Sequence, residues 1–231
     1  MKRATPWVAG VIPVASGLLC AACGVAQLPV GASLSPTSQT TVACVGDSIT
    51  AGEGVAQSET YPAQLQEKLG GAYVVLNFGH PGATANSKGD VPYVSQPEYA
   101  QALASGPNIV ILMLGTNDAR SPNDTPDLEA TFEGDYEKLA TSFVDLPSHP
   151  QVYLVTPIRV ISDLGISEPI LASLVRPQVR DVAAKLGLPL VEFETVLGDK
   201  AANYQADGIH PTSAGYDVMS TALYGVLHSP P

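Results

Sequence analysis

The chain has 231 residues, of which 45% are hydrophobic, and its 22 acidic against 11 basic side chains give a formal net charge of −11. This length suits one domain, and a strongly acidic surface without basic runs excludes nucleic acids and anionic lipid surfaces as partners. Of the three cysteines, only Cys44 falls beyond residue 26, so the folded part has no internal disulfide.

The N-terminus has the pattern of an export signal. A basic start, Lys2-Arg3, precedes an apolar stretch over residues 8–19 and then small residues. This pattern predicts a signal peptide over residues 1–26. The alternative is a lipoprotein signal, because CAAC (20–23) resembles a bacterial lipobox in which Cys23 becomes the lipidated first residue. In that motif Cys20 replaces the usual leucine.

Residues 27–40 are polar, small and Pro-containing, which predicts a flexible linker, and the domain then spans residues 41–228. Within it, apolar β-branched runs alternate with segments of helical periodicity. A proline at position 177 is expected to kink or split the fourth helix. The predicted elements are, in order, strand 41–45, helix 60–70, strand 73–78, helix 97–105, strand 108–115, helix 127–146, strand 151–157, helix 168–187, strand 188–193 and helix 213–228.

Strands that alternate with helices predict an α/β fold with a parallel sheet covered by helices on both faces. Ligands of such sheets bind at the carboxyl ends of the strands. The loops that are richest in polar residues and glycine follow the predicted strands, so we expect them to meet at that edge. These loops are GDSIT (46–50), GHPGAT (79–84), GTNDAR (115–120), TPIR (156–159) and ADGIHP (206–211).

The GDSITAGEG loop after the first strand allows two functional interpretations. A phosphate-binding loop requires glycine, four residues and then Gly-Lys-Ser/Thr. Here the glycine spacing differs, and Glu53 would repel phosphate. The other interpretation is that Ser48 is a nucleophile, which needs a base, a residue that orients the base, and donors for an oxyanion.

The remaining loops offer those groups. Asp207 and His210 are three residues apart, so the carboxylate can orient the imidazole while its other nitrogen faces Ser48. The side-chain amide of Asn117 and the backbone amides of Gly82 and Ser48 are the candidate oxyanion donors. Each motif alone is common in structural turns, and the functional interpretation depends on all of them reaching one sheet edge.

These blocks resemble the SGNH (GDSL) hydrolase family. GDSIT, NFGHPGAT (77–84), GTND (115–118) and DGIHP (207–211) are similar to its first, second, third and fifth blocks. The resemblance implies a flavodoxin-like three-layer α/β/α fold with a five-stranded parallel sheet, and ester hydrolysis without metal or cofactor. It also implies that Ser48, His210 and Asp207 form the triad and that Ser48, Gly82 and Asn117 form the oxyanion hole.

The amino-acid sequences of these blocks are most similar to those of secreted carbohydrate esterases. This similarity implies a short-chain ester substrate such as an O-acetylated sugar. A thioesterase or lysophospholipase for longer acyl chains is the alternative enzyme, and a non-catalytic carbohydrate-binding envelope protein is the alternative of another class. His80, Arg120 and Arg159 are candidate substrate contacts, each with a structural role as the alternative. We expect a monomer that is secreted or held in the cell envelope, with a lipid on Cys23 as its one membrane attachment.

Overall fold

The computed structural model describes residues 39–162 and 164–228. The predicted signal peptide, Cys23 and nearly all of the predicted linker lie outside this range. The first strand begins at Thr40, the last residue of that linker. No helix in the described ranges is both long and apolar enough to span a membrane.

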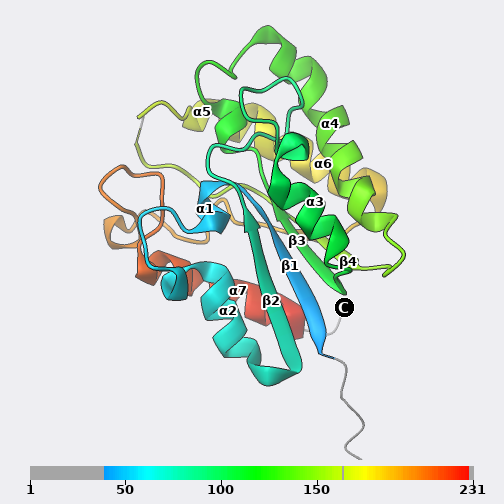
Figure 1. Cartoon of the computed structure of the whole chain (residues 1–231). Helices are drawn as coiled ribbons and strands as arrows, with labels where there is room; N and C mark the ends of the chain where they lie inside the picture. The colour runs from blue at the N-terminus through cyan, green and yellow to red at the C-terminus, as the bar shows by residue number, and fades with distance from the viewer. Residues whose placement is uncertain (1–38, 163, 229–231) are drawn as a thin grey trace, which may run out of the picture. The chain divides into compact units, whose positions relative to one another are not determined.

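One parallel sheet organises the domain (Figure 1), with the strand order β2-β1-β3-β4-β5. β1 and β3 lie inside the sheet and are apolar on both faces, as expected for strands that helices cover on both sides. The strands are β1 (Thr40–Gly46), β2 (Tyr73–Gly79), β3 (Ile109–Met113), β4 (Gln151–Val155) and β5 (Leu190–Val191).

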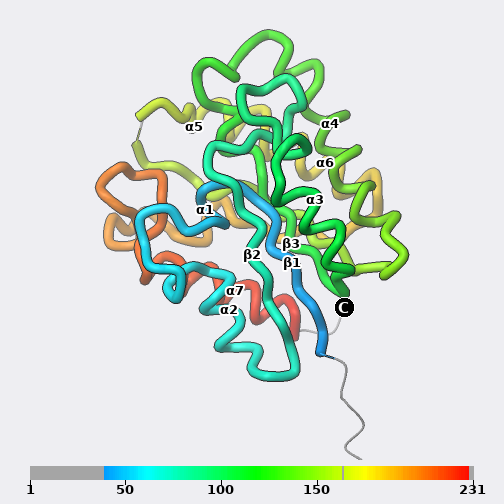
Figure 2. Tube along the Cα trace, viewed as in Figure 1, coloured from blue at the N-terminus to red at the C-terminus, as the bar shows by residue number. Residues whose placement is uncertain are grey.

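Helices cover both faces of the sheet (Figures 1 and 2). α2 and α7 pack on the face that includes Val42 and Cys44, and α3, α4 and α6 pack on the face that includes Ala43 and Val45. This arrangement confirms the predicted three-layer α/β/α fold. The helices are α1 (Ser48–Ala51), α2 (Tyr61–Leu69), α3 (Pro97–Ala104), α4 (Pro126–Val144), α5 (Glu168–Ile170), α6 (Arg176–Leu186) and α7 (Ser213–His228).

Two predicted elements differ in extent from the observed ones. The helix predicted over 168–187 consists of α5, a π-helical stretch over Leu171–Val175, and α6, in which Pro177 is near the N-terminus, where proline costs no hydrogen bond. The strand predicted over 188–193 pairs only at Leu190–Val191. Beyond it, the amide of Phe193 donates to the Thr156 hydroxyl instead of a strand carbonyl, which ends the ladder.

The strand order changes direction at β1, because β2 lies on one side of β1 and β3 on the other. In sheets of this order, the crevice outside the carboxyl end of β1 is the usual ligand site. Ser48 follows β1 directly, so the topology places it at that crevice.

Candidate active site

Ser48 is the first residue of α1, the short helical turn that follows β1. Asp47 caps this turn, since its carboxylate accepts the amide of Ile49 at 2.9 Å. The Ser48 hydroxyl is 2.9 Å from Nε2 of His210, although 162 residues separate them in sequence. The turn thus presents the serine to the loop that precedes α7.

That loop is held in shape by Asp207. One oxygen of its carboxylate accepts the amides of Ile209 and His210 at 2.9 and 3.0 Å, and the other lies 2.6 Å from Nδ1 of His210. Partial burial by itself would raise the pKa of Asp207, but the hydrogen bonds from the imidazole and the two amides lower it below its ordinary value. Asp207 therefore carries its negative charge beside the imidazole near neutral pH.

The three side chains form one hydrogen-bonded chain from Ser48 through His210 to Asp207. With Asp207 at Nδ1, the imidazole carries its proton there and offers a free Nε2 to the serine. The contact distances match those needed for a base to take a proton from a nucleophile. This geometry can activate Ser48 for attack on a carbonyl carbon.

The candidate oxyanion donors come from the segments after β1, β2 and β3. Gly82 has a φ of +78°, a conformation that L side chains rarely adopt. Asn117 is buried, and one hydrogen of its side-chain amide bonds the carbonyl of Ala83 at 3.1 Å, which leaves the second hydrogen to donate elsewhere. The backbone amides of Gly82 and Ser48 have no acceptor among the described residues.

Asp118 ties these two loops together. Its fully buried carboxylate accepts the backbone amides of Ala85 and Asn86 at 2.9 and 2.8 Å. Burial raises the pKa of Asp118 to about 7, although the two amides act in the opposite direction. Asp118 therefore anchors the loop that contains Gly82 to the turn that carries Asn117.

Asp47 is a second buried carboxylate. Its Oδ2 has no hydrogen-bond partner among the described residues. Burial raises its pKa from 3.8 to about 6, while the amide of Ile49 partly offsets this effect. Near neutral pH, a negative charge is therefore enclosed directly behind the candidate nucleophile.

This burial predicts a pH-dependent stability effect of Asp47→Asn. Because the folded-state pKa of Asp47 is raised, its destabilising charge is absent below pH 3.8 and fully developed above pH 6. Asparagine caps helices equally well and carries no charge. Between pH 4 and pH 7, the unfolding free energy of the variant should therefore gain on wild type by on the order of 2 kcal/mol. Urea unfolding at both pH values measures the gain, and a difference that is independent of pH would contradict it.

The three candidate substrate contacts all have acidic neighbours. His80 lies 2.9 Å from Glu98, and Arg120 bonds Asp90 at 2.7 Å, so both help to hold the loops in place. Arg159 pairs with Asp199 at 2.6 Å. Of the three, only Arg159 lines the groove described next.

An open groove of about 670 Å³ lies between the loops after β3 and β4. Ser162, at its edge, donates its hydroxyl to the carbonyl of Asp207, so the groove borders the loop that carries the candidate base. Hydroxyl and charged side chains line it together with apolar ones. Among the described residues, no three or more His, Cys, Asp or Glu side chains gather in a way that could hold a metal ion.

Reasoning from the sequence missed Arg176. This residue lies on the buried stripe of α6 with Val179 and Ala183, and its side chain is fully enclosed. The sequence signal that could have identified it is its position, because Arg176 is a charged residue in line with the apolar positions of the helical repeat. Glu168, its ion-pair partner, lies eight residues earlier and carries no pattern that would link the two.

Comparison with known proteins agrees with the fold and the motifs. Residues 44–218 match the model of the GDSL-like lipase/acylhydrolase family. The chain is 33% identical over 209 residues to an acetylxylan esterase of Xylanibacter ruminicola, and the match covers 80% of this chain and 42% of that protein. The chain thus spans less than half the length of this relative.

Solved structures with the same fold include esterases. The aryl esterase of M. smegmatis matches with a TM-score of 0.68 at 19% identity, covering 81% of this chain and 98% of that one. A carbohydrate acetylesterase family member of Sinorhizobium meliloti matches with a TM-score of 0.61 at 20% identity, covering 82% and 97%. At these identities the likeness shows the fold.

Proposed function

We propose that this chain, which belongs to the GDSL-like lipase/acylhydrolase family, is a serine esterase that removes short acyl groups, and O-acetyl groups of carbohydrates in particular. The observation that carries the proposal is the hydrogen-bonded chain of Ser48, His210 and Asp207, with contacts of 2.9 and 2.6 Å. Such a chain supplies a nucleophile, a base and a residue that orients the base.

In the first half of the reaction, the Ser48 hydroxyl attacks the ester carbonyl and His210 takes its proton. Asp207 stabilises the imidazolium that forms. The oxyanion accepts hydrogen bonds from Asn117 and from the amides of Gly82 and Ser48. When the tetrahedral intermediate collapses, His210 gives its proton to the departing alcohol oxygen, and the acyl group remains on Ser48.

In the second half, water attacks the acyl-enzyme and His210 acts as the base again. The same donors hold the second oxyanion, and the proton returns from His210 to Ser48 as the acid leaves. Every proton transfer therefore uses Nε2 of His210, which the Asp207 contact at Nδ1 keeps available.

Two observations support a sugar ester as substrate. The relative that is 33% identical is an acetylxylan esterase. The groove beside the Asp207 loop is open and combines Arg159, Asp124 and Ser121 with apolar side chains. This mixture suits a sugar, which has both hydroxyl groups and apolar C–H faces. The triad and the oxyanion donors do not line the groove, so it would hold a part of the substrate beside the reacting ester.

The longer-chain alternative, a thioesterase or lysophospholipase, is decided by acyl-chain length. We expect the kcat/KM for p-nitrophenyl esters to be highest for acetate and to fall by about tenfold or more by octanoate. Release of acetate from acetylated xylan should accompany that profile. A maximum at eight carbons or longer would move the assignment to the alternative.

The non-catalytic alternative is decided by covalent labelling. A fluorophosphonate should label Ser48, because that reagent reacts with activated serines. If the protein hydrolyses no ester of any chain length and takes no label, the carbohydrate-binding alternative is favoured.

The proposal also places the enzyme outside the cytoplasm. It is either released by cleavage after residue 26 or held at the membrane by a lipid on Cys23. Lipid labelling in cells would distinguish these two cases.

A further inference from the structure

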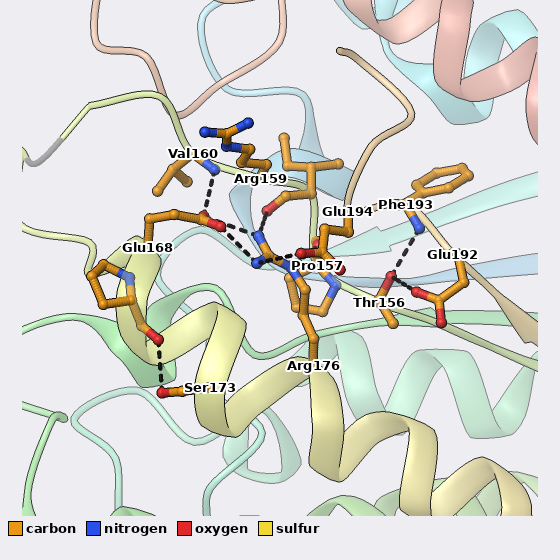
Figure 3. Close-up of polar contacts among 12 residues, drawn as sticks. Thr156, Pro157, Arg159, Val160, Glu168, Ser173, Arg176, Glu192, Phe193 and Glu194 are labelled. Atoms are coloured by element: carbon orange, nitrogen blue, oxygen red, sulfur yellow. Dashed lines mark hydrogen bonds and ion pairs between the residues drawn. The ribbon is translucent and has the colours of Figure 1, made fainter. Parts of the chain in front are cut away.

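Arg176 is the largest fully buried side chain of the described residues. Burying a charge is costly unless it is paired and hydrogen-bonded, so such a residue needs an explanation. Its guanidinium bonds both carboxylate oxygens of Glu168, at 2.7 and 3.0 Å (Figure 3). It also donates to the backbone carbonyls of Pro157 and Ile158, at 2.9 and 2.8 Å.

These contacts hold one side of the segment 157–162, which follows β4. Glu168 adds a further contact to the segment. Its Oε2, which accepts a hydrogen bond from Arg176, also accepts the amide of Val160 at 2.9 Å (Figure 3). Two carbonyls and one amide of the segment are therefore bonded to the Arg176–Glu168 pair, and Glu194 lies 3.7 Å from the same guanidinium. Because that pair is shielded from water on the arginine side, it is little weakened by solvent or salt.

The other side of the same segment holds the loop that carries the base. The amide of Ile161 donates to the carbonyl of Gly208 at 2.9 Å, and the Ser162 hydroxyl donates to the carbonyl of Asp207. Gly208 has a φ of +67°, and a Cβ at this position would lie only 2.6 Å from Cβ of Ser162. The two backbones are thus in close contact at Asp207.

A third bond joins the two segments. Tyr204, which precedes the loop, donates its hydroxyl to the carbonyl of Arg159 at 2.9 Å. Along residues 157–162, the groups of 157, 158 and 160 therefore face the buried ion pair, while those of 159, 161 and 162 face the segment 204–208. A displacement of the segment would move the carboxylate of Asp207 relative to Ser48.

We propose that Arg176 and Glu168 are positioning residues for the Asp207–His210 loop, and that they act through the segment 157–162. This inference rests on the proposed esterase function. The physical reason is that proton transfer needs His210 at hydrogen-bond distance from Ser48, and a misplacement of about 1 Å can cost on the order of 100-fold in rate. The loop itself belongs to neither a strand nor a helix, so its position depends on such neighbours.

Lys185 provides a matched control on the same helix. It pairs with Glu137 of α4 at 2.7 Å, and its side chain is 54% exposed. Arg180 is unsuitable, because its partner Glu194 also lies 3.7 Å from Arg176. Lys185→Gln removes an ion pair of α6 that has no hydrogen bond or ion pair to Glu168 or to the segment 157–162 among the described residues.

The experiment compares Arg176→Lys, Ser162→Ala and Lys185→Gln with wild type. Lysine keeps the positive charge but loses the planar fork that bonds Glu168 and two carbonyls at once. With p-nitrophenyl acetate, we expect Arg176→Lys to lower kcat by about 10- to 100-fold with little change in KM. Ser162→Ala should lower kcat in the same direction, and Lys185→Gln should retain it.

A second readout does not depend on catalysis. Hydrogen exchange of the backbone amides in residues 204–211 should become faster in Arg176→Lys and Ser162→Ala, and stay unchanged in Lys185→Gln. The double variant Arg176→Lys/Ser162→Ala should lose less kcat than the product of the single losses, because both changes act through one segment.

Wild-type kcat and unchanged exchange in Arg176→Lys would overturn the proposal. If Arg176→Lys fails to fold, Ser162→Ala serves as the test. Wild-type kcat and wild-type hydrogen exchange in Ser162→Ala would also overturn the proposal. If wild type hydrolyses no ester and Ser48 takes no fluorophosphonate, the proposed function fails. Exchange in residues 204–211 then still shows whether the ion pair holds the loop.

Discussion

Replacement of Ser48 by alanine should lower the rate of ester hydrolysis by about 10⁴-fold or more while the fold persists. The loss is expected because the variant has no atom to form the acyl-enzyme, so that neither half of the reaction can occur. The fold should persist because, among the described residues, the Ser48 hydroxyl bonds only His210, while Asp47 still caps α1. Hydrolysis of p-nitrophenyl acetate and the thermal midpoint measure the two expectations.

A serine outside the site provides the control. The Ser142 hydroxyl donates to a carbonyl within α4, far along the chain from the triad. Ser142→Ala should retain both hydrolysis and fluorophosphonate labelling, whereas Ser48→Ala should lose both. Undiminished turnover in Ser48→Ala would contradict the mechanism and require a different nucleophile.

Asp207→Asn is expected to have the second largest effect, a loss of about 10³- to 10⁴-fold in kcat. The asparagine oxygen can still accept the amides of Ile209 and His210, so the loop should retain its shape. Its amide nitrogen would then face Nδ1 of His210 as a donor. The imidazole would have to carry its proton on Nε2, where it can no longer take the proton of Ser48.

Asp217→Asn is the matched control. Asp217 lies on α7 and pairs at the surface with Lys68 of α2, at 2.7 Å. It should retain kcat. The thermal midpoint of Asp207→Asn should stay near that of Asp217→Asn, which separates a lost charge from a lost fold. A kcat within tenfold of wild type in Asp207→Asn would show that the imidazole is oriented by another group.

Much of the fold could be predicted from local patterns. The continuous apolar run 108–115 indicates a strand buried on both faces, and the helical repeat 127–146 indicates a helix with one buried face. Both occur in the structure, as β3 and α4. The predicted parallel sheet and the family are confirmed. The predicted enzyme class, a carboxylic ester hydrolase, is the function proposed above. The early end of β5 could not be predicted, because it depends on the contact of Phe193 with Thr156. A break in the helix predicted over 168–187 was expected from Pro177, but its π-helical form was not.

The candidate site residues could also be predicted from the sequence. They occur in polar, glycine-containing loops directly after the predicted strands, and parallel strands bring their carboxyl ends to one edge of the sheet. Ser48, Asp207 and His210 are joined in the structure as the spacing suggested. Their catalytic roles stay predictions until the variants are measured. The partners of His80, Arg120 and Arg159 were not accessible, because surface ion pairs join residues that no periodicity relates.

The sequence by itself determined the order of strands and helices, the composition of the loops at the sheet edge, and the family. Those features follow from local side-chain periodicity and from motifs that each lie within one loop. Only the tertiary structure decided which loop supports which. Segments far apart in the chain come together to bury Asp47 and Asp118 and to place the ion pair of Arg176 behind the Asp207 loop. The pKa values of the two buried aspartates are raised by desolvation, which arises only once those segments have packed together.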